Sequence, residues 1–172
     1  MTKTIATLAI AGLASSAAAA PSSFVDLGVI GAPGSYTFNT DGSFNTAFQF
    51  DADTELGLWD SAGILIDDDD DGSVGLFSEI TANLAPGEYF LGISEFDSIF
   101  DDGFINSGTA LEPGDVIDAV LNINGSFAGS QIIEDLGDGT AETAFFRVEV
   151  IPAPGAMGLV GVAGLAAVRR RR

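Results

Sequence analysis

Apolar and polar side chains alternate along several stretches in the middle of the chain. Residues 116–123 (VIDAVLNI) place apolar side chains at every second position, and residues 144–150 (AFFRVEV) repeat the pattern. Successive side chains of a strand point to opposite faces, so this period of two predicts β-strands with one buried face. The positions that we expect in the core are Leu56, Leu58, Tyr89, Leu91, Leu121, Ile123, Phe146 and Val148.

Two earlier segments predict a β-hairpin. Tyr36 and Phe38 are followed by Phe48 and Phe50, each pair at a spacing of two, and Asp41-Gly42 lies between the pairs. Asp-Gly is a typical hairpin turn, because both residues tolerate the positive φ angles that tight turns require. We therefore expect the two aromatic pairs to lie on neighbouring antiparallel strands.

The middle region as a whole has the pattern of an all-β domain. Within residues 20–150 no segment keeps a period of 3.6, and Pro86-Gly87 marks a turn before another apolar strand. Many short strands separated by turns predict an antiparallel two-sheet β-sandwich. A domain of about 130 residues can bury an adequate core without disulfides, and this chain has no cysteine to form one.

Charge is distributed very unevenly along the chain. All 25 acidic residues lie between Asp26 and Glu149, where Arg147 is the only basic residue, so this region carries a net charge of −24. Such a surface repels nucleic acid and anionic lipid and attracts cations, so we expect no nucleic-acid partner. The hydrophobic fraction of 47% and the 13 phenylalanines indicate a folded domain and not a disordered acidic tail.

Catalysis has little support in the residue types present. The chain has neither histidine nor cysteine, which removes Ser-His and Cys-His dyads from consideration. Paired carboxylates can hydrolyse glycosides, but with so many carboxylates a pair in the sequence carries no information. We therefore expect a protein that is not an enzyme.

The N-terminus is typical of a secretory signal peptide. Lys3 is followed by an apolar stretch at residues 5–14 and then by small residues, with cleavage expected between Ala19 and Ala20. The alternative is a short buried helix. Residues 1–19 are thus expected to form a signal helix, which would send the domain out of the cytoplasm.

The C-terminus has a comparable tripartite order. Residues 155–168 are uncharged, and as a helix they would span about 21 Å against a hydrocarbon core of about 30 Å. Pro152 and Pro154 precede this short apolar helix and prevent its extension into the domain. Residues 169–172 are four arginines, which the positive-inside rule would keep in the cytoplasm.

This order resembles the PEP-CTERM tail, a sorting signal that exosortase-type transpeptidases recognise. The residues that match it are Pro152, Pro154, Arg169, Arg170, Arg171 and Arg172, with Pro152-Ala153-Pro154 standing where the family has Pro-Glu-Pro. The resemblance implies signal peptidase and an exosortase as partners, transient or lasting contact with the membrane, and delivery to the cell envelope, the cell surface or the extracellular matrix. A simple C-terminal membrane anchor is the alternative, and it places residues 20–150 outside the cytoplasm as well.

A second resemblance covers roughly residues 45–95. The parts that carry it are Asp53-Thr54, Leu56, Leu58 and Trp59, then the acidic run 67–71, then Gly87-Glu88-Tyr89-Phe90. This order is similar to that of bacterial pre-peptidase C-terminal-type domains. The resemblance implies a jelly-roll-like β-sandwich that serves as a non-catalytic accessory module of a secreted protein, and some modules of this type bind calcium.

The acidic run itself suggests a metal site. Asp67, Asp69 and Asp71 alternate before Gly72, as in the first half of a calcium-binding loop, in which alternate carboxylates surround one cation. Ser78 stands where an EF-hand loop would end in glutamate, so the run is not an EF-hand. Two interpretations stay open, a solvated acidic loop and a calcium site. Further ligands could come from Asp51 and Asp53, or from Asp97, Asp101 and Asp102 in a second acidic loop.

Two classes of function agree with these observations. The first is a structural or adhesive protein of the cell envelope or extracellular matrix, and a cargo that is cut and released differs from it only in fate. The second is a binding module for an extracellular polysaccharide or peptide, with or without calcium. Trp59 is expected to be a partly buried core residue, and its alternative role is a platform on which a sugar ring stacks.

Overall fold

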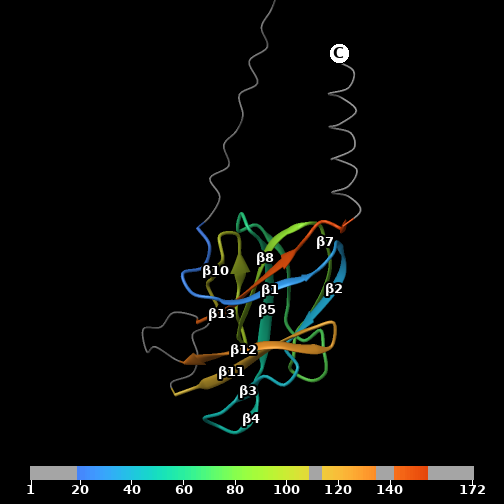
Figure 1. Cartoon of the computed structure of the whole chain (residues 1–172). Coiled ribbons are helices and arrows are strands. Elements are labelled where there is room, and N and C mark those ends of the chain that lie inside the picture. The colour runs from blue at the N-terminus through green and yellow to red at the C-terminus, as the bar shows by residue number, and fades with distance from the viewer. Residues whose placement is uncertain (1–18, 109–113, 135–141, 155–172) are drawn as a thin grey trace, which may run out of the picture.

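The computed structural model describes residues 19–108, 114–134 and 142–154 (Figure 1). The predicted signal peptide at residues 1–19, apart from Ala19, lies outside the described residues. So do the expected apolar helix and Arg169–Arg172 of the tail, whereas Pro152 and Pro154 are described and exposed. In the described part of the chain, no helix is long and apolar enough to cross a membrane.

The expected all-β class is confirmed by the described residues, which form two large sheets and a small ribbon. The first sheet has five strands, antiparallel except for the parallel pair of its first two members. Their order is β1 (Val25–Gly31), β13 (Ala144–Val150), β8 (Gly87–Glu95), β5 (Thr54–Asp60) and β6 (Leu65–Asp69).

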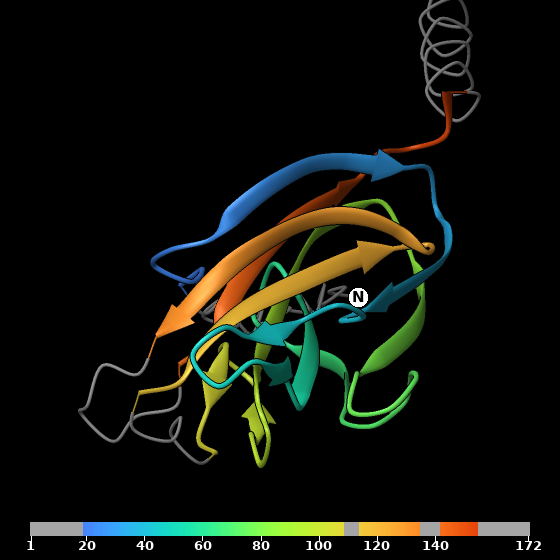
Figure 2. The same ribbon diagram turned by 90° about the horizontal axis from the view of Figure 1, so that it is seen from below.

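The second sheet is organised around one central strand, β11 (Val116–Ile123). On one edge β11 pairs with β12 (Ser126–Glu134) through the two-residue turn Asn124-Gly125, and these two strands form a long curved hairpin (Figure 2). The other strands of the sheet are β2 (Gly34–Asn39), β3 (Phe44–Asn45), β4 (Phe50–Asp51), β7 (Glu79–Leu84) and β12 (Ser126–Glu134). The separate ribbon consists of β9 (Phe100–Asp101) and β10 (Ile105–Asn106).

Side chains from both large sheets form one hydrophobic core. The strands β11 and β13 alternate strictly between more and less buried positions over most of their lengths, as their sequence period predicts. Of the expected core residues, Ile123 is partly buried and packs against the core, and the others are buried. The buried members are Leu56, Leu58, Tyr89, Leu91, Leu121, Phe146 and Val148.

The predicted hairpin between Tyr36–Phe38 and Phe48–Phe50 is wrong. Asn39 pairs with Asn122 and Asn45 pairs with Ile117, so β2 and β3 run in succession along one edge of β11, because β12 occupies the other edge. The residues Thr40–Ser43 interrupt this pairing as a local turn, closed by the Ser43 N–H donating to the Thr40 carbonyl at 3.0 Å. The Asp41-Gly42 pair therefore bends one strand and does not reverse the chain.

The strand β5 is buried on both faces. Its residue Trp59 points away from the main core into an aromatic cluster with Phe100, Phe104 and Phe145. The indole N–H donates to the Asp101 carbonyl at 2.9 Å, which attaches the β9–β10 ribbon to the outer face of the first sheet. Trp59 is fully buried, more than we expected, and a buried ring cannot serve as a sugar platform.

Candidate metal centre

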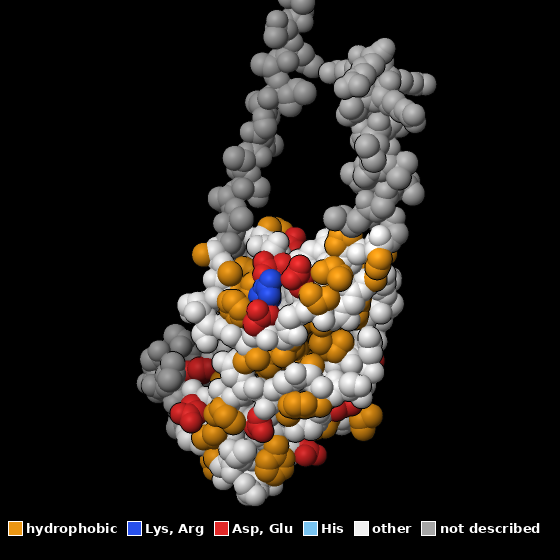
Figure 3. All heavy atoms as spheres, in the orientation of Figure 1, with side chains coloured by type: hydrophobic (Ala, Val, Ile, Leu, Met, Phe, Trp, Pro, Cys, Tyr) orange, Lys and Arg blue, Asp and Glu red, His pale blue; other side chains and the backbone are white. Residues whose placement is uncertain are grey.

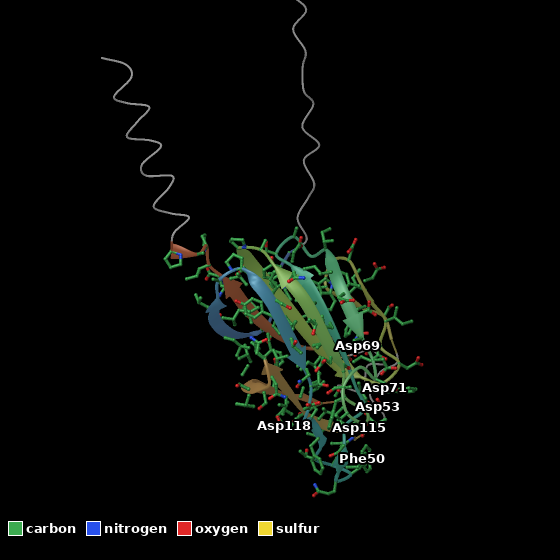
Figure 4. The ribbon with its side chains drawn as sticks, turned by 90° about the vertical axis from the view of Figure 1, so that its right-hand side faces the viewer. Phe50, Asp53, Asp69, Asp71, Asp115 and Asp118 are labelled. Carbon is green, nitrogen blue, oxygen red and sulfur yellow. The ribbon has the colours of Figure 1, made fainter. Side chains whose placement is uncertain are left out.

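Three carboxylates next to the ends of two neighbouring strands converge at one end of the first sheet. The strands β5 and β6 are antiparallel, and Leu56 opposite Asp69 sets a register that places the residue before β5 beside the residues after β6. As a result, one carboxylate oxygen from each of Asp53, Asp70 and Asp71 lies within 4.8 Å of the other two. In Figure 4, Asp53 and Asp71 lie next to each other at the edge of the domain. We call these three residues the acidic triad.

The loop after β6 is held in a fixed shape by its neighbour Asp69. The Oδ2 atom of Asp69 accepts hydrogen bonds from the Gly72 N–H and the Glu79 N–H, each at 2.8 Å. A Cβ atom at Gly72 would come within 2.8 Å of the Asp69 Cγ atom, so only glycine fits this turn without displacing Asp69. Asp69 thus shapes the loop that carries two members of the acidic triad.

A second loop, which follows β8, is hydrogen-bonded to the residues around Asp53. The Asp53 carbonyl accepts a hydrogen bond from the Phe96 N–H at 3.0 Å, and the Glu55 carboxylate accepts one from the Ser98 N–H at 3.0 Å. These bonds bring the residues after β8, including Asp97, close to the acidic triad. Glu55 is thus bonded to this loop and is a fourth carboxylate near enough to Asp70 to feel its charge.

Partial burial and mutual repulsion raise the pKa values of Asp53, Asp70 and Glu55. Burial, followed by the charges of Asp70 and Asp71, raises the pKa of Asp53. The pKa of Asp70 is also raised, first by burial and then by its acidic neighbours. Burial, together with the charge of Asp70, raises the pKa of Glu55 to about 7, although hydrogen bonds from the backbone at Ser98 and Asp97 oppose the change. Each of these carboxylates would be stabilised by a nearby positive charge.

No basic side chain in the described part of the chain supplies that charge. Arg147, the only basic residue between Asp26 and Glu149, lies on β13 and forms ion pairs with Asp26, Glu88 and Glu149. In Figure 3 it is the blue group surrounded by red side chains. Two strands, β8 and β5, follow β13 in the sheet before β6 is reached, so Arg147 serves a different group of carboxylates.

One oxygen atom of the acidic triad lacks a partner. The Oδ1 atom of Asp53 is buried and accepts no hydrogen bond from the described residues. A buried carboxylate oxygen without a donor is costly, since desolvation is not compensated. A hard cation is the natural partner of such an oxygen, because carboxylates and carbonyl oxygens are the ligands that Ca²⁺ and Mg²⁺ prefer.

The residues expected as ligands lie in two groups. The structure brings Asp53 and Asp71 together and adds Asp70, which the alternating pattern had passed over. Asp67 and Asp69 belong to the strand β6, and Asp51 pairs with Phe44 in the β3–β4 hairpin. The alternation assumed a loop throughout residues 67–71, whereas the chain leaves the sheet only after Asp69, so the first two loop residues reach Asp53.

The second acidic loop divides in a similar way. The Oδ1 atom of Asp102 accepts a hydrogen bond from the Leu65 N–H at 2.8 Å, and that of Asp101 accepts one from the Asp102 N–H at 2.7 Å. Asp102 therefore holds the start of β6, and the Asp101 side chain stabilises its own turn in the ribbon. Only Asp97 lies close enough to raise the pKa values of Glu55 and Asp70.

No family model, no curated protein and no solved structure matches this chain. The fold and the acidic triad are therefore interpreted from the residues of this chain alone.

Proposed function

We propose that this chain is a non-catalytic extracellular domain that calcium stabilises at Asp53, Asp70 and Asp71. The observation that carries the proposal is the buried, unpartnered Oδ1 atom of Asp53, whose carboxylate lies beside two further carboxylates with no basic side chain among them. One divalent cation would compensate both the desolvation of this oxygen and the repulsion within the triad.

Calcium suits this arrangement better than the other common divalent metals. The acidic triad supplies only oxygen ligands, and the chain has no histidine or cysteine with which to favour zinc. Magnesium demands a compact octahedron and gives up its water reluctantly, whereas calcium accepts six to eight oxygens in flexible geometry. Exposed members of the triad, Asp70 and Asp71, leave space for water to complete the coordination.

The proposed role of the domain is structural or adhesive, in the cell envelope or the extracellular matrix. Support comes from the absence of histidine and cysteine in the sequence and from one core shared by two sheets. We interpret this arrangement as a jelly-roll-like β-sandwich of the pre-peptidase C-terminal type. Residues 1–19 would be removed by signal peptidase, and an exosortase would act at the tail that contains Pro152 and Pro154.

Thermal unfolding of the full chain tests the calcium proposal. At a calcium concentration of about 100 times Kd, binding stabilises the folded state by about 2.7 kcal/mol, which corresponds to a rise of several degrees in Tm. Sodium chloride at matched ionic strength and magnesium should both raise Tm less. Changing Asp53→Asn or Asp71→Asn should remove most of the calcium increment.

Asp67→Asn is the matched control for these variants. It removes one negative charge, as each of these variants does, and it lies in the same acidic run as Asp71, but Asp67 is an exposed residue of β6 outside the triad. The control should keep the full calcium increment. If calcium, magnesium and sodium chloride raise Tm equally, or if Asp67→Asn loses as much as Asp53→Asn, the acidic run is a solvated surface and the proposal is wrong.

A further inference from the structure

Two phenylalanine rings project from the tip of the β3–β4 hairpin. The side chains of Phe48 and Phe50 are 54% and 51% exposed. Their planes lie within 19° of parallel, with the ring centroids 6.3 Å apart. Parallel rings in face-to-face contact would need a spacing of only about 3.5–4 Å, so at 6.3 Å neither ring fully covers a face of the other.

The tip that carries the rings is built by a dense set of hydrogen bonds. Asn45 is fully buried, and its Oδ1 atom accepts the N–H groups of Ala47 and Phe48, each at 3.1 Å. Its Nδ2 atom donates to the buried Asp115 at 2.7 Å. On the other side of the tip, Gln49 Nε2 donates to the Thr46 carbonyl at 2.6 Å. These bonds hold both aromatic residues in place before any ligand arrives.

The residue between the two phenylalanines has a backbone conformation that residues other than glycine rarely adopt. Gln49 has a φ of 63°, in the left-handed region that normally favours glycine. Strain of this kind is retained where the surrounding structure enforces it, and such positions concentrate at functional sites. Here the strained residue lies between the two exposed rings, so the aromatic pair and the unusual backbone are one local feature.

The size of the aromatic pair limits what it can bind. A phenylalanine side chain covers roughly 150–250 Å² when fully buried, so two half-exposed rings offer on the order of 200 Å². A stable protein interface needs about 800 Å² from each partner. The pair alone is therefore too small for a second folded protein, and it matches a ligand the size of a few sugar rings.

Charge limits the ligand further. Residues 46–50 carry no charge, and the surrounding domain has a net charge of −24, which repels anionic polysaccharides and anionic lipids. Pyranose rings present C–H groups on one face, which pack on aromatic rings, and hydroxyl groups at the edge. Close to the rings, Asp51 is exposed on the same hairpin and offers a hydrogen-bond acceptor for those hydroxyl groups.

We propose that Phe48 and Phe50 form a contact site for a neutral polysaccharide. The site is separate from the acidic triad, and it gives the proposed structural or adhesive protein a partner of defined chemistry. The inference rests on the extracellular location proposed above. It does not require calcium, so the two proposals can fail independently.

Affinity electrophoresis of the purified full chain tests the site directly. The chain is run through gels that contain a neutral β-glucan, an α-glucan or a mannan, in the presence of a calcium chelator. At least one of these polymers should retard the wild-type protein, and the double variant Phe48→Ala, Phe50→Ala should raise its Kd about tenfold or more. Phe127→Ala is the matched control, because Phe127 is a single phenylalanine on β12 that is 67% exposed.

Several results would overturn the inference. One is that none of the three polymers retards the wild-type protein. Another is that Phe127→Ala weakens polysaccharide binding as much as the double variant does. Flotation with phosphatidylcholine vesicles that depends on Phe48 and Phe50 would assign the rings to a lipid surface, and sedimentation of a dimer that the double variant loses would assign them to a second copy. In the presence of the chelator, the double variant should unfold on heating with the same Tm as the wild type, which shows that it is folded.

Discussion

The aromatic cluster on the outer face of the first sheet predicts a large cost for replacing Trp59 with phenylalanine. Trp59 is fully buried, its ring centroid lies 5.1 Å from that of Phe100, and its N–H donates to the Asp101 carbonyl at 2.9 Å. Phenylalanine keeps an aromatic ring but loses this donor, and leaving a carbonyl unpaired costs about 1–3 kcal/mol. The missing part of the indole adds about 1–2 kcal/mol as a cavity.

The expected total for Trp59→Phe is therefore about 2–5 kcal/mol, or a fall in Tm of roughly 5–20 °C for a chain of this size. Differential scanning calorimetry of the full chain without calcium measures it. Phe127→Leu is the control, since it changes an exposed side chain and should alter the free energy of unfolding by no more than about 0.5 kcal/mol. If the fall in Tm for Trp59→Phe is no larger than that for the control, Trp59 does not attach the β9–β10 ribbon to the sheet.

Three further predictions follow from the packing and the charges. Glu55 has a pKa of about 7 in the folded state against an ordinary value of 4.5, so between these pH values the folded state binds more protons than the unfolded state. The calcium-free protein should therefore lose stability as the pH rises from 4.5 to about 7, and denaturant titrations should show a smaller loss for Glu55→Gln. Gly57→Ala should destabilise the chain by about 1–3 kcal/mol in urea unfolding, because a Cβ atom there would lie 2.9 Å from the Phe100 ring, whereas Gly34→Ala, with no atom closer than 3.9 Å, should not. Arg147→Met should lower Tm by more than Glu149→Gln does, with the difference shrinking in high salt, because Arg147 contacts Asp26 and Glu88 more closely than it contacts Glu149; equal shifts at all salt concentrations would contradict that ranking.

Local patterns predicted the strands well where each strand has one buried face. The alternation at β11 and β13 identified Leu121, Phe146 and Val148 as core residues because burial there follows the period of the strand. Asn-Gly is a strong hairpin signal that our prediction did not use, and Asn124-Gly125 is the turn of the long β11–β12 hairpin. Asp41-Gly42 has similar turn chemistry but only bends a strand.

Most of the features that the sequence did not predict depend on contacts between residues far apart in the chain. Whether Asp41-Gly42 reverses the chain depends on β11, which is more than 70 residues away and pairs with the residues on both sides of the bend. Burial of Trp59 likewise requires the β9–β10 ribbon, which lies about 40 residues further along the chain. The acidic triad depends on where β6 ends, and a run of five aspartates contains no local signal for that boundary.

Direct measurement of bound calcium tests the central claim. After equilibrium dialysis of the full chain against calcium in a large excess of magnesium, wild-type protein and Asp67→Asn should each retain one tightly bound calcium ion per chain, and Asp53→Asn should retain much less. A wild-type chain that retains no calcium, or an Asp53→Asn variant that retains as much as the wild type, would contradict the assignment of Asp53, Asp70 and Asp71 as the metal site.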